Sequence, residues 1–131
     1  MLVGIHQPHY LPWLRYFEKI ARSDVFILLD DVQFSKNGWQ NRNKVKTPNG
    51  VALLTVPVHA HFDAALYNVT IDNRRPWRAK HRRTLDQSYG KAPFYESHRR
   101  FLDDVYSQHW ERLVDLNTYM LGYFVRALGI E

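Results

Sequence analysis

The apolar positions in the first part of the chain predict two short strands that flank one amphipathic helix. Residues 2–5 and 25–29 are apolar runs of strand length. Between them apolar side chains recur at helical spacing over residues 12–22, and Pro12 suits the first helical position, where no backbone N–H is needed. The expected inner stripe consists of Trp13, Tyr16, Phe17, Ile20 and Ala21. Because two strands joined by a helix usually form a right-handed parallel crossover, the pattern predicts a βαβ unit.

The rest of the chain predicts a hairpin followed by helices. Thr47-Pro48-Asn49-Gly50 is a strong turn sequence, and the apolar, β-branched run at 51–56 follows it. Helical periodicity returns in three segments, residues 76–89, 93–106 and 110–128. The strands expected to share one small mixed sheet are 2–6, 25–30 and 51–57. The predicted class is therefore α/β, with an N-terminal βαβ unit, a small mixed sheet and three C-terminal helices.

Composition narrows the class of protein. The chain has 131 residues, 45% of them hydrophobic and 15% aromatic, which predicts one folded domain spanning 1–131. The absence of cysteine excludes disulfides, thiolate metal sites and a cysteine nucleophile. No apolar run is long enough to span a bilayer and no secretory signal pattern opens the chain, so a cytoplasmic location is expected. A net charge of +5, with seven histidines in addition, favours acidic partners such as phosphates, nucleotides, nucleic acid or anionic lipid.

Polar side chains follow both strands of the predicted βαβ unit. His6, Gln7 and His9 come after the first strand, and Asp30 and Asp31 come after the second. In parallel sheets ligands bind beyond the carboxyl ends of the strands, so these groups are expected at one edge. A histidine there is a candidate general base, and a carboxylate can orient it or bind a divalent ion. The candidate catalytic residues are His6, His9, Asp30 and Asp31. The alternative, a histidine satisfied at a strand end and an aspartate in a turn, stays open.

The segment after Asp31 has no regular periodicity and mixes aromatic, amide and cationic residues, which is typical of a functional loop. Its cations suit phosphate, its amides suit a sugar or base, and Trp39 suits stacking on a ring. The candidate substrate- or phosphate-binding residues are Gln7, Gln33, Lys36, Trp39, Asn41, Arg42 and Lys44. A polar surface loop pinned by Phe34 and Trp39 is the alternative.

Three further features leave alternatives open. Six cations without an intervening acid predict either a phosphate- or nucleic-acid-binding surface or a solvated helix face. They are Arg74, Arg75, Arg78, Lys80, Arg82 and Arg83. His59 and His61 are two apart but have no third ligand at a recognised spacing, so no metal site is predicted there, and Mg²⁺ is the one cofactor considered. Asn117 alone breaks the apolar stripe of the last helix and must find partners, a site or another subunit.

The residues HQPHYLPWLRYFEKIARSD, followed by DDVQFSKNGWQNRNKVKTPNG, resemble the WbqC-like family. The resemblance is dense over 3–58 and continues through Lys80-His81 and 89–93 to 128–130. That family is associated with bacterial surface-polysaccharide and O-antigen gene clusters, and its members are generally regarded as transferases. Family members continue into a second portion, so the resemblance implies a short or truncated member that lacks it.

Three functions remain on the sequence. The resemblance implies a transferase of O-antigen or lipopolysaccharide biosynthesis that acts on a phosphate-bearing sugar or nucleotide-sugar, with aminoacyl or acyl transfer as one reaction. The layout of strand, His-containing loop, helix and strand is also similar to HxGH nucleotidyltransferases, with 9–12 in the corresponding place, although the glycine and the second histidine are missing. The third is a basic nucleic-acid-binding module or a non-catalytic subunit, as a homo-oligomer or with a partner chain that supplies the missing portion.

Overall fold

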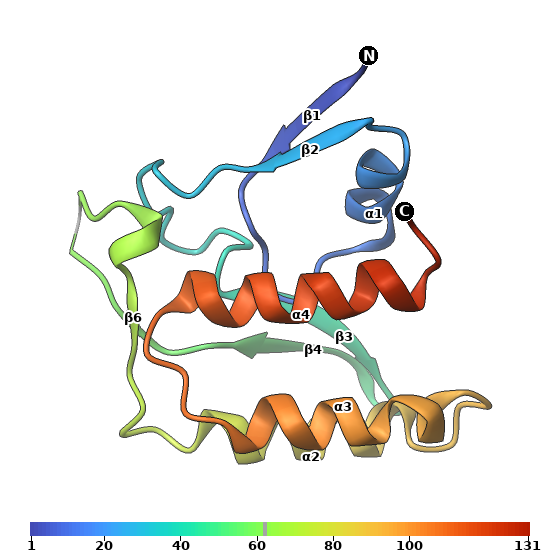
Figure 1. Cartoon of the computed structure of the whole chain (residues 1–131). Helices are drawn as coiled ribbons and strands as arrows, with labels where there is room; N and C mark the ends of the chain where they lie inside the picture. The colour runs from blue at the N-terminus through green and yellow to red at the C-terminus, as the bar shows by residue number, and fades with distance from the viewer. Residues whose placement is uncertain (62) are drawn as a thin grey trace.

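A computed structural model describes residues 1–61 and 63–131 of the chain. Its strands are β1 (Val3–His6), β2 (Val25–Leu28), β3 (Arg42–Thr47), β4 (Gly50–Thr55), β5 (Val58–His59) and β6 (Thr70–Ile71). Its helices are α1 (Leu14–Ala21), α2 (Trp77–Tyr89), α3 (Tyr95–Ser107) and α4 (Leu113–Ala127), with a 3₁₀ turn at Leu66–Asn68. Figure 1 shows α4 between two groups of elements, with β1, β2 and α1 on one side and the β3–β4 hairpin, α2 and α3 on the other.

The predicted α/β class and the predicted parallel crossover are confirmed. β1 and β2 pair in parallel, with Val3 opposite Val25 and His6 opposite Leu28. The single mixed sheet is wrong, because the described strands form three separate pairs, β1–β2, β3–β4 and β5–β6. The inward side chains of the hairpin, Val45 and Leu54, are buried in a core shared with α2 and α3, on the far side of α4 from β1. The hairpin therefore packs in a different core from the parallel pair and does not join its sheet.

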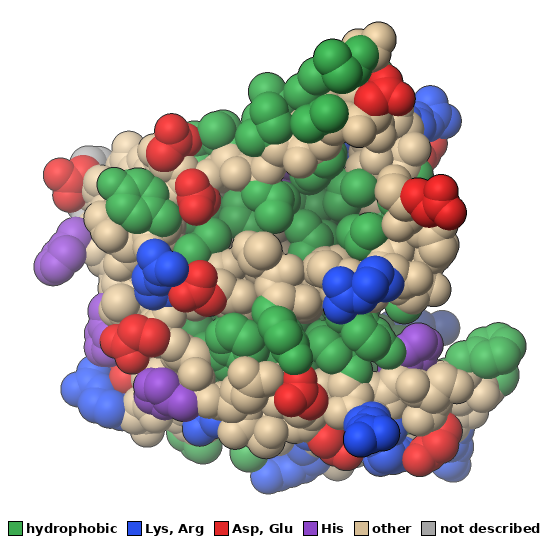
Figure 2. All heavy atoms as spheres, in the orientation of Figure 1, with side chains coloured by type: hydrophobic (Ala, Val, Ile, Leu, Met, Phe, Trp, Pro, Cys, Tyr) green, Lys and Arg blue, Asp and Glu red, His purple; other side chains and the backbone are tan. Residues whose placement is uncertain are grey.

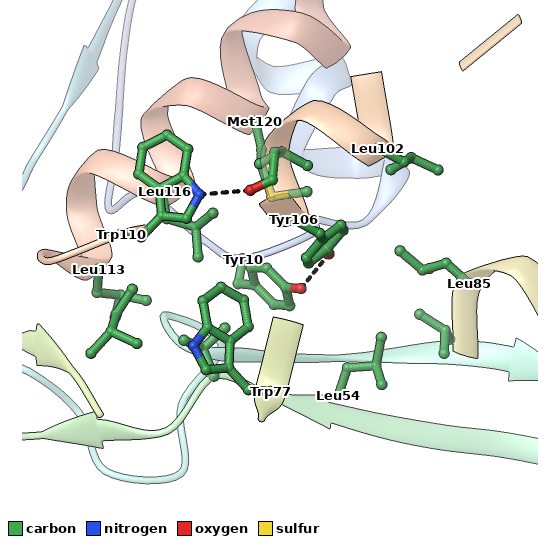
Figure 3. Close-up of a cluster of buried hydrophobic side chains, with 14 of the residues drawn as sticks. Tyr10, Leu54, Trp77, Leu85, Leu102, Tyr106, Trp110, Leu113, Leu116 and Met120 are labelled. Carbon is green, nitrogen blue, oxygen red and sulfur yellow. Dashed lines mark hydrogen bonds between the residues drawn. The ribbon is translucent and has the colours of Figure 1, made fainter. Parts of the chain in front are cut away.

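The main hydrophobic core lies between the hairpin and α2, α3 and α4, and Tyr10 from the loop after β1 is fully buried within it (Figure 3). The Tyr10 hydroxyl lies 2.5 Å from the Tyr106 hydroxyl and donates to His81 Nδ1 at 2.7 Å. The other ring nitrogen of His81, Nε2, donates to the Thr55 carbonyl at 3.1 Å. Every side-chain polar atom of this buried hydrogen-bond network is thus paired, as burial requires. The network attaches the loop after β1 to α2, α3 and β4.

Trp110 illustrates a difference at the start of the last helix. The helix was predicted from residue 110, but α4 begins at Leu113. Trp110 nevertheless is only 9% exposed, and its indole N–H donates to the Val105 carbonyl at 2.8 Å. The apolar periodicity therefore marked a core position correctly, while the backbone there is held by tertiary contacts outside the helix.

A smaller hydrophobic cluster joins α1 to α4 through Tyr16, Phe17 and Leu121, and Phe26 and Leu28 of β2 pack against it. Trp13 was predicted on this inner stripe but is 62% exposed, because it precedes the helix as its N-cap in extended conformation. Ala21 is also exposed.

The opposite face of the parallel pair is bare. Hydrophobic side chains gather over β1 and β2 in Figure 2, and those exposed between 43% and 52% are Val3, Ile5, Val25 and Ile27. Parallel strands are normally covered on both faces, so this face is unusual for its class. Of the helices described, not one combines the length and hydropathy that crossing a bilayer requires.

Candidate functional site

Two loops that are distant in the sequence form one layer of the structure. The opening loop (residues 7–12) follows β1, and the polar loop (residues 31–41) follows β2. The Gln40 side-chain amide donates to Gln7 Oε1 at 2.9 Å, and the Tyr10 N–H donates to the Trp39 carbonyl at 3.3 Å. Gln40 Oε1 in turn accepts the Ser35 N–H at 2.8 Å. The structure therefore brings the two predicted candidate segments together, and it does so through Gln40, which sequence reasoning missed.

Asn117 of α4 anchors both loops from below. It is 1% exposed, and its side-chain amide donates to the Gln40 carbonyl at 2.7 Å and to the Pro8 carbonyl at 3.4 Å. These contacts supply partners for the residue that breaks the apolar stripe of α4: its side-chain N–H groups donate to the backbone of each loop. Its Oδ1 atom is buried without a hydrogen-bond partner among the described residues. The break in the stripe was the sequence signal, but its partners lie far along the chain.

The centre of this layer is a cluster of three rings. The ring centroids of His6 and His9 are 4.6 Å apart, and the Tyr16 ring lies 4.9 Å from His6 and 5.3 Å from His9. His6 Nδ1 lies 3.0 Å from the Gln7 carbonyl, which also accepts the Tyr16 hydroxyl at 2.8 Å. The sequence placed Tyr16 in the helix core, and periodicity alone did not indicate that its ring would lie against two histidines.

His9 has the electrostatics of a neutral imidazole. Burial, reinforced by the neighbouring charges of His6 and Lys19, lowers the pKa of His9 to about 4. Its Nδ1 atom is buried and has no hydrogen-bond partner among the described residues. Burial also raises the pKa of the Tyr16 phenol far above its ordinary value, so that this hydroxyl stays protonated. The cluster at neutral pH therefore offers an uncharged, unpaired ring nitrogen beside a neutral phenol.

The two aspartates lie outside this cluster. Asp31 is exposed, and the Asp30 backbone carbonyl accepts the Tyr67 N–H at 3.0 Å. Within the described ranges no hydrogen bond or ion pair joins either carboxylate to His6 or His9, and no group of three or more acidic or histidine side chains is placed to hold a metal ion. Because Mg²⁺ is often held by one or two carboxylates together with substrate phosphate, magnesium binding here stays a prediction. The catalytic role of both aspartates stays a prediction.

Trp39, Arg42 and Lys44 form a cationic and aromatic cluster at the end of the polar loop. The Arg42 guanidinium lies 5.8 Å from the Trp39 ring centroid, and the Lys44 ammonium lies 5.9 Å from it. Arg42 also donates to the Asn37 carbonyl at 2.5 Å. Two cations can pair with an anionic group, and the face of an indole can stack on a ring. The structure therefore groups these three predicted binding residues on one surface.

The remaining predicted binding residues are placed differently. Asn41 is buried, and its amide donates to the Val56 carbonyl at 3.0 Å, so it joins the loop to the strand segment after β4. Gln33 and Lys36 line a separate surface hollow of about 790 Å³, together with His61. Gln33 also forms an isolated β-bridge with Ala65. Asn41, Gln33 and Lys36 are therefore not part of the cluster around Trp39.

Three cations of the basic segment form contacts within the fold. Arg74 donates to both carboxylate oxygens of Asp72, at 2.9 and 3.2 Å, and Arg78 donates to the backbone carbonyls of Ser107 and Gln108. Arg82 pairs with Asp103 at 2.7 Å and also with Asp86. The contacts of Arg78 and Arg82 join α2 to α3, and Arg74 pairs with Asp72 before α2 begins. A nucleic-acid-binding role for the segment stays a prediction.

Replacing Arg82 with methionine is expected to lower the free energy of unfolding. The side chain is only 14% exposed and bridges α2 to α3. Its loss leaves the Asp103 carboxylate without its guanidinium partner and removes one donor to Asp86, which still accepts from Tyr95 and Arg99. Because both carboxylates are partly solvated, the expected cost is about 1–2 kcal/mol. Urea unfolding measures it. Arg83→Met on the exposed neighbour is the control, expected within about 0.5 kcal/mol of the wild type, and equal effects of the two variants would contradict the bridging role.

Comparison with known proteins identifies the family. The profile of the WbqC-like protein family matches residues 7–131. The chain belongs to the WbqC-like protein family. It is 36% identical over 133 residues to the uncharacterized protein Rv1507c of Mycobacterium tuberculosis (strain ATCC 25618 / H37Rv), an alignment that covers 98% of this chain. This WbqC-like chain spans 57% of the length of that relative. No solved structure matches it significantly.

Proposed function

We propose that this WbqC-like chain carries the substrate-binding layer of a transferase in bacterial surface-polysaccharide biosynthesis, of the O-antigen or lipopolysaccharide type. The substrate class is a phosphate-bearing sugar or a nucleotide-sugar, and aminoacyl or acyl transfer to the sugar is the reaction that fits a general base. The observation that carries the proposal is the layer in which hydrogen bonds join the opening loop, which carries His9, to the polar loop. The polar loop leads directly into the cluster formed by Trp39, Arg42 and Lys44.

The chemistry assigned to this layer separates proton transfer from anion binding. His9 is the proposed base, because its low pKa keeps the ring unprotonated at neutral pH. Without substrate, the His9 ring has a pKa near 4 and is a weak base. An anionic substrate beside it stabilises the imidazolium and raises that pKa toward neutrality. Arg42 and Lys44 are proposed to neutralise the phosphate, and Trp39 to stack on a base or sugar ring. In this scheme substrate binding itself activates the histidine.

A ligand panel tests this proposal. Thermal unfolding is measured with nucleotides, nucleotide-sugars and sugar phosphates, because a ligand at about 100 times its dissociation constant adds roughly 2.7 kcal/mol of stability. One nucleotide-sugar or sugar phosphate is expected to raise the melting temperature of the wild type, and Arg42→Met is expected to remove most of that shift. Arg100→Met, an exposed arginine on α3, is the matched control and is expected to keep it.

Proton transfer is tested with the ligand that the panel identifies. His9→Ala is expected to lower turnover by about 10²–10⁴-fold, the usual contribution of a general base, while binding persists. His109→Ala, which changes an exposed histidine, is expected to leave turnover unchanged. Full turnover by His9→Ala would remove the base from the proposal. Absence of any shift with phosphorylated sugars would reject the substrate class.

A further inference from the structure

A cleft lies where the two hydrophobic clusters meet, apart from the histidine pair. Its volume is about 460 Å³, and its walls come from the opening loop, α1, β3 and the ends of α2, α3 and α4. Phe124 of α4 packs against both clusters and also lines the cleft. The cleft thus lies beside Phe124, a ring that packs against both cores. Clefts of this size and apolar lining are typical of small-molecule sites.

One wall of the cleft is held rigidly. Tyr123 stacks on Phe101 with ring centroids 3.7 Å apart and planes 3° from parallel. The Tyr123 hydroxyl also lies within hydrogen-bonding distance, 2.6 Å, of His98 Nδ1. The aromatic ring therefore has both its face and its hydroxyl fixed before any ligand arrives. A wall that is ordered in advance reduces the entropy lost on binding.

The mouth of the cleft is positive. Lys44 lines it, no Asp or Glu is among the described residues that do so, and Lys44 has no ion-pair partner in the described ranges. The guanidinium of Arg15 lies 5.8 Å from the ring centroid of Trp13, which also lines the cleft. An apolar interior with an exposed lysine in its lining matches a ligand with an apolar body and a negative head.

We infer that this cleft binds a small amphipathic anion, with an alkyl chain or ring between Phe17, Phe124 and Leu128 and a carboxylate or phosphate at Lys44. A purely apolar ligand would leave the lysine without a counter-charge, and a highly charged ligand would leave the aromatic walls exposed to water. The inference goes beyond the proposed function, because it shares only Lys44 with that site and requires no transfer reaction and no role for His9.

Calorimetric titration with short-chain probes tests the charge and the apolar body together. The probes are octyl phosphate and octanoate, which differ in the head group, and octylammonium, which reverses the charge. Both anions are expected to bind, and octylammonium is expected to bind about tenfold more weakly or not at all, since it meets the cationic mouth. The ratio of the two anion affinities identifies whether phosphate or carboxylate is preferred.

Two pairs of variants locate the bound probe. Ala127→Trp fills the cleft from an exposed position on α4 and is expected to weaken both anions by about tenfold or more. Thr118→Trp, at another exposed position of the same helix, is the control and is expected to change nothing. Lys44→Met is expected to weaken the anions about fivefold, whereas Lys46→Met on the same strand is expected to have no effect. Melting temperatures confirm that each variant is folded.

The result separates this inference from the proposed transferase. His9→Ala is expected to bind the octyl anions as the wild type does, so a failed activity assay leaves the cleft untouched. Equal affinity for octylammonium would overturn the charge assignment. Wild-type binding by folded Ala127→Trp, or no binding of either anion to the wild type, would overturn the site.

Discussion

Asn117→Ala is expected to lower the free energy of unfolding by about 2–4 kcal/mol, because it removes a buried donor and leaves a small cavity. The asparagine amide holds the Pro8 and Gln40 carbonyls, one on each loop of the candidate site. The alanine variant leaves these two loop carbonyls without the asparagine donor. Chemical denaturation monitored by tryptophan fluorescence measures the loss.

Binding is expected to change with stability. Since Asn117 holds the opening loop and the polar loop at their bases, the alanine variant is expected to bind the ligand of the proposed site more weakly even at temperatures where it is fully folded. Thr118→Ala, at the next and exposed position of α4, is the control and is expected within about 0.5 kcal/mol of the wild type. If Asn117→Ala lowers the free energy of unfolding by less than about 0.5 kcal/mol, the loops do not depend on this residue.

Stability is expected to fall by about 2–3 kcal/mol between pH 7 and pH 4.5 through the single buried residue His81. Burial lowers its pKa from 6.5 to about 4 in the folded chain. Above pH 6.5 the ring is neutral in both states, so the stability is complete. Below pH 6.5 the unfolded chain gains a proton that the folded chain cannot accept until about pH 4, so stability falls across that interval.

The structural reason is the direction of the hydrogen bonds. His81 accepts from the Tyr10 hydroxyl through Nδ1 and donates to the Thr55 carbonyl through Nε2. A proton on Nδ1 would oppose the Tyr10 hydroxyl in a site that is 2% exposed. The pH profile of His81→Gln is expected to be flatter over this interval, whereas His109→Gln is expected to keep the wild-type slope. An unchanged slope in His81→Gln would assign the pH dependence to other groups, of which the more exposed His9 is the first.

Part of the candidate site could be predicted from the sequence. Seven residues were expected to bind substrate or phosphate, and the structure groups three of them because they lie close along one short segment: Trp39, Arg42 and Lys44. His6 and His9 were expected near each other for the same reason. Asp30 and Asp31 were expected at the same edge because β1 and β2 are parallel neighbours. The strands are indeed parallel, and after β2 the chain pairs with Ala65 and Tyr67. No hydrogen bond or ion pair among the described residues joins the two carboxylates to the histidines, so their shared role stays a prediction.

The sequence by itself determined the elements and their local order. The helices, the β3–β4 hairpin and the parallel crossover follow from periodicity, turn residues and the handedness of short connections, all of which act over a few neighbouring residues. It also determined that Asn117 could not be an ordinary core residue.

The tertiary structure alone decided which surfaces meet. It split the expected sheet into separate pairs, placed Tyr16 against two histidines, and made Gln40 and Asn117 the links between loops that are remote in the chain. These outcomes depend on how α4 packs between two groups of elements. Such packing is set by the joint burial of side chains from distant segments, which no local pattern of residues encodes.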